Sequence, residues 1–492
     1  MRDLQPIFLV QGFLLTTLGL AMALPALIDF ADQAVDDPFM SLAAQESWIG
    51  FAVSAMLTLF VGMSLLASAW GQGGQLTRKQ AFLLTTVSWV VLVAFAALPF
   101  VFSSIHLSYT DAFFEAMSGL TTTGSTIITD LERASRGIKM WRSLLQWLGG
   151  IGIIVMAIAV LPMLQVGGMQ LFRLESSDTS EKILPRATQI AGSITALYFA
   201  LTAICAGAYW AAGMDLFDSL AHAMTTIATG GFSTHDLSIG YFESPPVEVI
   251  AIVFMIVGSL PFALYIHAVR GNPLPLLRDS QVLCFFGIVA TAIGLLTLYQ
   301  LSTSEIANGE ALRSSAFNAV SIITGTGYAS TDYSAWGPFA IFAFFAMMFI
   351  GGCAGSTSCG IKIFRFQIIY GAVKVQVSRL MHPHGIFKIS YNGEPVSEKV
   401  VDSVASFFFL FFASFAILSV LLATMVDDPL TAFSAAGTAL ANVGPGLGSV
   451  GPADNFFHLS DGAKWLLSLG MLLGRLELFT VLVLFSPTFW RI

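Results

Sequence analysis

Ten long apolar stretches limit this chain to a membrane fold. A transmembrane helix needs about 20 apolar residues, and charge-free stretches of that length occur at 4–28, 47–76, 80–105, 143–172, 187–214, 249–269, 280–304, 333–361 and 403–426. A tenth, 465–490, is apolar apart from Arg475 and Glu477. Only 11% of the 492 residues are charged, about half the share found in soluble domains. We therefore expect an all-α polytopic membrane protein with ten transmembrane helices and both termini on one side.

The distribution of charge predicts which side of the membrane is cytoplasmic. The first apolar stretch is too long for a signal peptide, so we interpret it as an uncleaved helix. With the N-terminus inside, the inner segments hold 15 of the 22 lysines and arginines, as the positive-inside rule requires. Of the 30 acidic residues, 21 then lie outside. These acids either attract cations to an entrance or merely solvate the outer loops.

Four of the outer connections repeat one pattern. Each is too short to cross the membrane and return as two helices, and each ends at a glycine: 111–124, 218–231, 314–327 and 431–444. Aligned on that glycine without gaps, the four share an alanine eight residues before it, a hydroxyl six before it, and Leu or Ile four before it. A repeat with so long a period predicts four similar units, each with a helix, a re-entrant half-helix, a glycine loop and a second helix.

The glycine loops favour a pathway for a small cation. Irregular backbone at membrane depth persists only inside protein or along a watery cavity. Glycine permits positive φ, so successive carbonyls can point the same way, and four such loops around an axis can replace an ion's hydration shell. The half-helices direct their partly negative C-termini at that axis. The alternative, that these are small-residue helix contacts, explains the composition but not the same order four times.

At these glycines the sequence resembles the Trk/Ktr/HKT superfamily of potassium transporters, specifically the pore-forming subunits of bacterial Trk systems (TrkH/TrkI-like). The resemblance covers nearly the whole chain. It rests on four stretches taken together, which are Thr121-Thr122-Thr123-Gly124-Ser125, Thr229-Gly230-Gly231-Phe232-Ser233, Thr324-Gly325-Thr326-Gly327-Tyr328 and Asn442-Val443-Gly444-Pro445-Gly446-Leu447-Gly448. It implies that one chain imitates a tetrameric potassium channel, with four pore units in pseudo-fourfold symmetry around one pore.

The resemblance also implies the ion and its partners. Relatives with serine at the first filter glycine tend to carry sodium, and all four positions here are glycine, so K+ is the implied cargo. The implied filter, which binds K+ through backbone carbonyls, comprises Thr122, Thr123, Gly124, Thr229, Gly230, Gly231, Gly325, Thr326, Gly327, Asn442, Val443 and Gly444. Further implications are a homodimer in the lipid of the bacterial inner membrane, a cytosolic nucleotide-binding regulatory subunit (TrkA-like), no cofactor in this chain and no nucleic-acid partner.

Small residues interrupt the eighth apolar stretch, and a charge interrupts the tenth. The segment 351–360 is rich in glycine and hydroxyl residues, which either loosen a helix or pack closely against a neighbour. A charge inside a span is a functional candidate by default, although Arg475 could instead belong to a structural ion pair. In the family the segment is a gate below the filter, with glycine usual at the position of Cys359, and the arginine faces the pore. The implied gate residues are Gly351, Gly352, Gly355, Ser356, Thr357, Gly360 and Arg475.

The repeats divide the chain into five parts. We expect two extra N-terminal transmembrane helices in 1–76, pore repeat 1 in 77–172, pore repeat 2 in 173–272, pore repeat 3 with an interrupted second helix in 273–385, and pore repeat 4 in 386–492. The dipeptide Asn392-Gly393 between mixed apolar runs predicts a cytoplasmic β-hairpin before the fourth repeat. The inner segment 362–402 is either a docking surface or a solvated basic loop.

Two other classes of protein compete with a gated pathway. A secondary transporter that couples Na+ or H+ to K+ movement would be built on inverted repeats, whereas the four repeats here all enter from the outer side. An intramembrane enzyme needs a nucleophile or metal constellation. The sequence contains no His-Glu-x-x-His or Gly-x-Ser-x-Gly motif, so we expect no enzymatic activity.

Overall fold

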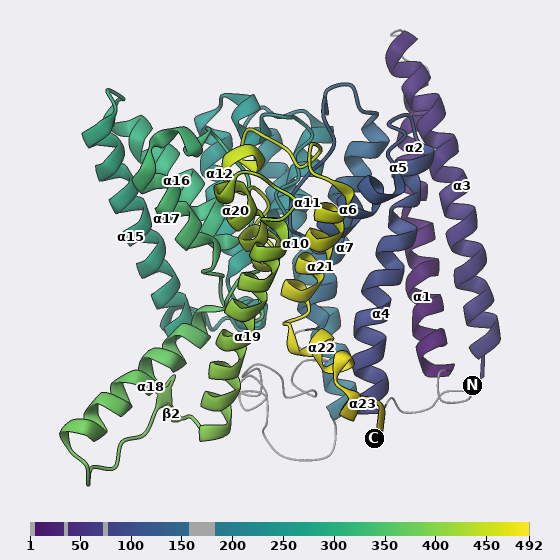
Figure 1. Ribbon diagram of the computed structural model, residues 1–492. Coiled ribbons are helices and arrows are strands. Elements are labelled where there is room, and N and C mark those ends of the chain that lie inside the picture. The colour runs from purple at the N-terminus through teal and green to yellow at the C-terminus, as the bar shows by residue number, and fades with distance from the viewer. Residues whose placement is uncertain (1–4, 34–37, 72–76, 157–182, 492) are drawn as a thin grey trace.

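The computed structural model describes residues 5–33, 38–71, 77–156 and 183–491, and these form a helical bundle with one small hairpin. Most of the long helices run between a lower and an upper end of the molecule, and α1 begins and α23 ends at the lower end (Figure 1). At the N-terminus, α1(Gln5–Ala21) continues almost directly into α2(Ala23–Asp32), and both pack against α3(Pro38–Ala69).

The rest of the described chain repeats one order of elements four times: a long helix, a short helix, a glycine loop and a second helix. The first unit comprises α4(Arg78–Ala96), α5(Leu98–Phe102), α6(Tyr109–Leu120) and α7(Arg136–Val155). The second comprises α10(Ile183–Ala211), α11(Leu216–Ile227), η3(Ser238–Phe242), α12(Pro245–Ser259) and α13(Phe262–Val269). The third comprises α14(Leu274–Arg278), α15(Ser280–Thr303), α16(Asn308–Thr324), η4(Tyr333–Trp336), α17(Pro338–Met348) and α18(Ile363–Met381). The fourth comprises α19(Glu398–Leu422), α20(Pro429–Ala441), η5(Gly448–Val450), α21(Asp461–Arg475), α22(Phe479–Leu482), η6(Val483–Phe485) and α23(Pro487–Arg491).

The part of the chain that the structure describes contains fewer clear membrane-crossing helices than the ten apolar stretches predict. Within the described residues, six helices are long and apolar enough to cross, or eight if each of two bent pairs counts as one span. The structure describes the stretch 143–172 only as far as residue 156. In the stretch 333–361, the helix α17 ends at Met348 and an irregular loop follows, as the small residues there predict.

Two stretches that we expected to form single spans are bent. The break between α12 and α13 turns the chain by 99°. Pro261 lies in this break, and the residue before a proline is driven out of the helical region, as the extended conformation of Leu260 shows. The break between α21 and α22 turns the chain by 108°, and there Glu477 and Leu478 adopt positive φ values of 60° and 47°. Arg475 is therefore the last residue of a helix and not the middle of one.

The predicted hairpin is present. The strands β1(Ser390–Tyr391) and β2(Glu394–Pro395) pair antiparallel. Asn392 and Gly393 form the turn with φ values of 48° and 87°, the positive pair that a type I′ turn requires. The Asn392 side chain also donates to Asp279 over 3.0 Å, which joins the hairpin to the start of α15. Together with α18, the hairpin projects from the lower end of the molecule (Figure 1).

Candidate ion pathway

Four short helices, α6, α11, α16 and α20, lead into the glycine loops. Three of them begin at a capping side chain that accepts a backbone N–H of the first turn: Ser108, Asp215 and Asp428. The positions shared by the repeat are buried in every unit. The alanines are fully buried, and the Leu or Ile residues are at most 5% exposed. The shared alanines are Ala116, Ala223, Ala319 and Ala436, and the Leu or Ile positions are Leu120, Ile227, Ile323 and Leu440. The sequence repeat therefore corresponds to one packing pattern used four times.

The backbone of the four loops has the same conformation. Two residues before each repeat glycine, φ is positive, at 54° for Thr122, 49° for Thr229, 71° for Gly325 and 54° for Asn442. The repeat glycines themselves have φ values of 92° for Gly124, 77° for Gly231, 83° for Gly327 and 112° for Gly444. Left-handed conformations at alternate residues turn successive carbonyls toward the same side, which few sequences without glycine tolerate.

One hydrogen bond also recurs in all four units. The N–H of the residue before each glycine donates to the carbonyl six residues before that glycine, over 2.8 to 3.1 Å. The four donors are Thr123, Gly230, Thr326 and Val443, and the acceptors are Ser118, Thr225, Ser321 and Thr438. Each loop is thus folded back onto the C-terminal end of its own short helix, where the helix dipole is partly negative.

The four loops close into a ring. A Cβ atom added to Gly124 would collide with the carbonyl oxygen of Gly230 in the second unit. In the same way, Gly231 meets the carbonyl of Thr326, Gly327 meets that of Val443, and Gly444 meets that of Thr123, which returns to the first unit. Only glycine permits this approach, because each added Cβ would lie within 3.0 Å of backbone. The structure therefore brings all twelve predicted filter residues together in one assembly, which we call the glycine ring.

Side chains from neighbouring units brace the glycine ring. Asn442 donates to the Thr123 hydroxyl over 2.8 Å, and Ser125 donates to the Gly444 carbonyl over 2.7 Å. The hydroxyl of Tyr328 lies in hydrogen-bonding contact with Thr225 of the preceding unit. These contacts join residues between 103 and 319 positions apart in the sequence. They hold the loops in register where no regular secondary structure does so.

The loop between α17 and α18 lies against the ring. The Thr357 hydroxyl donates to the carbonyl of Ile227, at the end of α11, over 3.0 Å. The Ser358 hydroxyl donates to the carbonyl of Thr324, at the end of α16, over 2.6 Å. The Cys359 thiol is 3.5 Å from the hydroxyl of Thr122 in the first loop. One short segment thus contacts the loop or short helix of three units.

Not every predicted gate residue lies near the ring. Gly351 and Gly360 pack against each other where the two ends of the loop meet, beside a parallel bridge between Ile350 and Ile361. Gly352 donates to the Ser358 hydroxyl over 2.8 Å. Gly355 and Ser356 lie in the far turn, where the Gly355 carbonyl accepts the N–H of Phe262 over 3.0 Å. Thr357 is the predicted loop residue with the most direct link to the ring.

Arg475 reaches this loop from the end of α21 and is 3% exposed. Its guanidinium donates to the Cys359 sulfur over 2.7 Å and to the Gly149 carbonyl over 3.1 Å, and it lies 3.5 Å from the Thr357 carbonyl. Among the described residues no acid forms an ion pair with Arg475. The nearby acid, Glu477, is instead paired with Arg365 at the start of α18. The described residues therefore provide no partner for the structural ion pair considered for Arg475.

Several acids assigned to the outer side are buried and paired. Glu115 is fully buried and accepts from Arg142 over 2.8 Å, and Asp111 accepts from Lys464 over 2.6 Å. Exposed acids do gather at the outer loops, where carboxylates of Asp130, Glu132 and Asp236 lie within 4.8 Å of one another. Burial, followed by a hydrogen bond with Glu132, raises the pKa of Asp236 to about 6.

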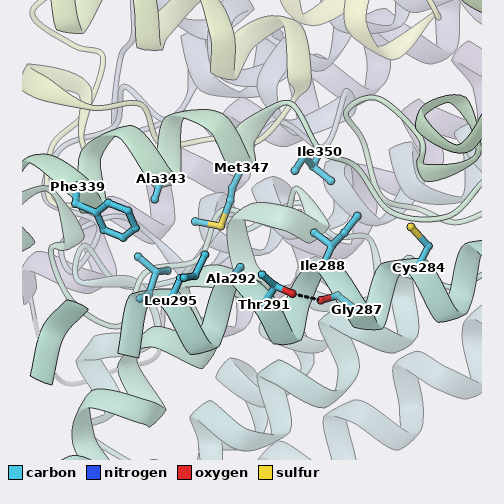
Figure 2. Close-up of a pocket in the computed structure, with 11 residues that line it drawn as sticks. Cys284, Gly287, Ile288, Thr291, Ala292, Leu295, Phe339, Ala343, Met347 and Ile350 are labelled. Carbon is cyan, nitrogen blue, oxygen red and sulfur yellow. Dashed lines mark hydrogen bonds between the residues drawn. The ribbon is translucent and has the colours of Figure 1, made fainter. Parts of the chain in front are cut away.

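A separate hollow lies on the outside of the bundle. It has a volume of about 560 Å³ and is bounded by α15 and α17. Figure 2 shows that its walls are mostly aliphatic. The Thr291 hydroxyl donates to the Gly287 carbonyl one turn earlier in α15, over 2.8 Å. The lining side chains offer only the Cys284 thiol and the already bonded Thr291 hydroxyl as polar groups, so the glycine ring remains the candidate pathway.

Four polar residues make contacts that the sequence did not predict. Gln146 and Arg142 on α7 contact the second glycine loop, Cys359 contacts Arg475, and Glu477 pairs with Arg365. Gln146 did carry a weak signal, since it is a long polar side chain within the apolar stretch 143–172. The pairings themselves have no local signature.

The helices and the glycine ring define a polytopic α-helical membrane protein with four helix–loop–helix units. A match to a family model narrows this class to one family. The TrkH family model, described as a cation transport protein, matches residues 50–492. The chain therefore belongs to the TrkH family of cation transport proteins, as the four glycine stretches predict.

Curated relatives and a solved structure are similar along nearly the whole chain. The Trk system potassium uptake protein TrkI of Halomonas elongata is 45% identical over 493 residues, covering 100% of this chain and 98% of the relative. The Trk system potassium uptake protein TrkH of Escherichia coli K12 is 39% identical, covering 88% of this chain and 91% of the relative. The crystal structure of the potassium transporter TrkH from Vibrio parahaemolyticus matches with a TM-score of 0.89 at 35% identity, covering 99% of each chain.

Proposed function

We propose that this chain is the pore-forming subunit of a bacterial potassium uptake system. The observation that carries the proposal is the closed glycine ring, in which the glycine of each unit meets the carbonyl of the next. A ring of inward-turned carbonyls replaces the hydration shell of a cation. The choice of potassium is supported by the names of the relatives from Halomonas elongata and Escherichia coli.

In this proposal the filter consists of the twelve residues of the glycine ring. Their carbonyls coordinate K+, and the four short helices direct partly negative ends toward it. Glycine is needed at Gly124, Gly231, Gly327 and Gly444 because φ is positive and the next unit leaves no room for a side chain. The exposed outer acids would raise the local concentration of cations before they enter.

The loop between α17 and α18, together with Arg475, forms the proposed gate. Hydrogen bonds from Thr357 and Ser358 to the ends of α11 and α16 hold the loop against the ring. A fixed positive charge about 6 Å from an ion, at an effective dielectric constant of about 20, repels it by about 3 kcal/mol. Arg475 would thus disfavour a resident ion until the loop moves away from the ring.

The proposed architecture has ten transmembrane helices and four re-entrant pore helices in pseudo-fourfold symmetry, with the two N-terminal helices outside the symmetry. The proposed location is the bacterial inner membrane with both termini in the cytoplasm, because the basic residues are concentrated on that side. The proposed partners are a second copy of this chain and a cytosolic nucleotide-binding regulatory subunit (TrkA-like). The projecting α18 and hairpin offer the regulatory subunit a surface on that side (Figure 1).

Reconstitution tests the proposal. The purified chain is placed in liposomes, and rubidium uptake is measured against potassium and sodium as competitors, with and without a nucleotide-loaded regulatory subunit. We expect potassium to compete with rubidium uptake and sodium to compete poorly. A folded protein that passes no cation under either condition would contradict the proposed function.

A further inference from the structure

The second glycine loop is held by a side chain from the first unit. The Gln146 side chain on α7 donates from Nε2 to the carbonyl of Gly230 over 2.6 Å. Its Oε1 accepts the N–H of Phe232 over 3.0 Å. The carboxamide thus makes one donor and one acceptor contact on either side of Gly231, as a neighbouring peptide group would. Gln146 is fully buried, so no water competes for these bonds.

The chemistry of the partners fixes the orientation of this amide. A backbone N–H is only a donor and a backbone carbonyl is only an acceptor. The oxygen of Gln146 must therefore face Phe232, and the nitrogen must face Gly230. A flipped amide would place two donors together and two acceptors together, so it is excluded.

Gln146 also explains a departure from the repeat. The residue before the repeat glycine is Thr123, Thr326 or Val443 in three units but Gly230 in the second. Gly230 is not among the residues with positive φ, so its backbone does not require glycine. A Cβ at Gly230 would lie within 3.0 Å of three atoms, all of which belong to the carboxamide of Gln146. The space for a side chain in the second loop is thus occupied by Gln146.

The bond from Gln146 makes the ring chemically unequal. Among the described residues, the equivalent carbonyls of Thr123, Thr326 and Val443 accept no hydrogen bond, whereas that of Gly230 does. A carbonyl that already accepts an N–H has one of its two lone pairs occupied, and the positive partial charge of the donor lowers the attraction of that oxygen for a cation. Four residues earlier on the same face of α7, Arg142 donates to the Ser233 carbonyl over 2.6 Å. The helix therefore fastens the second loop at two heights.

We propose that Gln146 is a positioning residue for ion selectivity, which acts by fixing the Gly230 carbonyl and weakening it as a ligand. The inference rests on the proposed function, since it assigns a selectivity role within the same ring. Removing the Gln146 side chain would restore the Gly230 carbonyl as a strong ligand and loosen the second glycine loop. Both changes favour the smaller, more strongly hydrated sodium ion. A stronger oxygen ligand compensates more of its dehydration, and a looser loop can close around its smaller radius.

The first test compares Gln146→Leu with Gln300→Leu in liposomes. Gln300 is also a buried glutamine, but its Oε1 accepts the Ser314 hydroxyl over 3.1 Å in the N-terminal half of α16, the end away from the ring. Loss of the two Gln146 hydrogen bonds should lower the preference for potassium over sodium about five- to tenfold, as expected for one or two hydrogen bonds. The control should keep the wild-type preference. An unchanged preference in folded Gln146→Leu would overturn the inference.

A stability measurement covers the case in which Gln146→Leu does not fold. Gly230→Ala is introduced into the wild type and into Gln146→Ala, and the melting temperatures of the four purified proteins are compared. The loss caused by Gly230→Ala should be clearly smaller in the Gln146→Ala background, where the carboxamide no longer occupies the space. Equal losses in both backgrounds would contradict the packing on which the inference stands.

The two tests separate this inference from the proposed function. If the wild type is selective and Gln146→Leu is equally selective, the role of Gln146 is wrong and the potassium pathway stands. If the wild type passes no potassium, the proposed function is wrong. The selectivity role of Gln146 then falls with it.

Discussion

The guanidinium of Arg475 lies 2.7 Å from the sulfur of Cys359, so the last residue of α21 is joined directly to the loop beside the glycine ring. Through Gly149 the same guanidinium reaches α7 of the first unit, over 3.1 Å. One buried cation therefore connects the fourth unit, the loop and the first unit. In the proposed function this connection combines a structural tie with a repulsive charge on the ion path.

Removal of the Arg475 side chain should open the pathway. We expect Arg475→Ala to raise basal rubidium uptake at least severalfold, because the variant loses both the repulsion of about 3 kcal/mol and the tie to Cys359. Arg475→Lys is the matched control, since it keeps the charge without the planar fork. Its uptake should stay close to the wild type. Unaltered uptake in Arg475→Ala would instead favour a purely structural role.

A side chain at Gly124 should reduce selectivity. Serine there must adopt a φ of 92° and avoid the Gly230 carbonyl, so the ring has to widen or shift. We expect Gly124→Ser to lower the preference for potassium over sodium by about tenfold or more. A change of about 1.4 kcal/mol in the relative binding free energies of the two ions is enough for a tenfold effect. Gly71→Ser is the control. Gly71 also has a positive φ, of 79°, but open space around it, so selectivity should not change.

The pair between Glu477 and Arg365 should matter for stability. Arg365 is fully buried, and its guanidinium lies 3.8 Å from the centre of the Phe407 ring. Glu477→Gln removes the carboxylate from a buried cation, which typically costs about 3 kcal/mol. A melting experiment in detergent should show a clear fall in the melting temperature. Glu394→Gln in the exposed hairpin is the control, and an equally small effect of both would show that the buried pair contributes little.

The outer acids should make uptake depend on pH. Burial and a hydrogen bond with Glu132 raise the pKa of Asp236 to about 6. Burial alone would raise the pKa of Glu132 too, but its hydrogen bonds, that with Asp236 first, lower it overall. As the pH falls from 7 to 5, Asp236 should therefore take up a proton and Glu132 should not. At low salt we expect the initial rate of uptake to fall by about twofold for this one lost charge.

The stability effect of Asp236 has a defined sign. Its pKa in the folded protein lies above the usual aspartate value of 3.8, so the folded state binds the proton more tightly. The resulting stabilisation is fully present below pH about 4 and is lost as the pH rises through about 6. Asp236→Asn should remove both this dependence and the step in uptake. A step of undiminished size in that variant would assign the titration to another group.

Much of the ring could be predicted from the sequence because its determinants are local. The glycines at 124, 231, 327 and 444 adopt positive φ, and the alanines at −8 pack identically, so a gapless alignment was enough to find them. The turn at Asn392 and Gly393 is local in the same sense. Membership of the TrkH family followed from the same short stretches.

The remaining features depend on contacts between distant segments. Gln146 meets Gly230 across 84 positions, and Arg365 meets Glu477 across 112. The bend after Arg475 occurs at Glu477 and Leu478, neither of which is glycine or proline, so no local preference announces it. Hydropathy predicts one span here, because apolar composition indicates how many residues can lie in the membrane. It does not indicate where a helix bends.

Locating the permeant ion tests the central claim most directly. Crystals of the purified protein grown in rubidium, measured at the rubidium absorption edge, would place the ion by anomalous scattering. We predict a peak inside the glycine ring, in contact with carbonyls from all four loops, among them those of Thr123, Gly230, Thr326 and Val443. Rubidium absent from the ring and bound elsewhere, in a preparation that still transports it, would contradict the account.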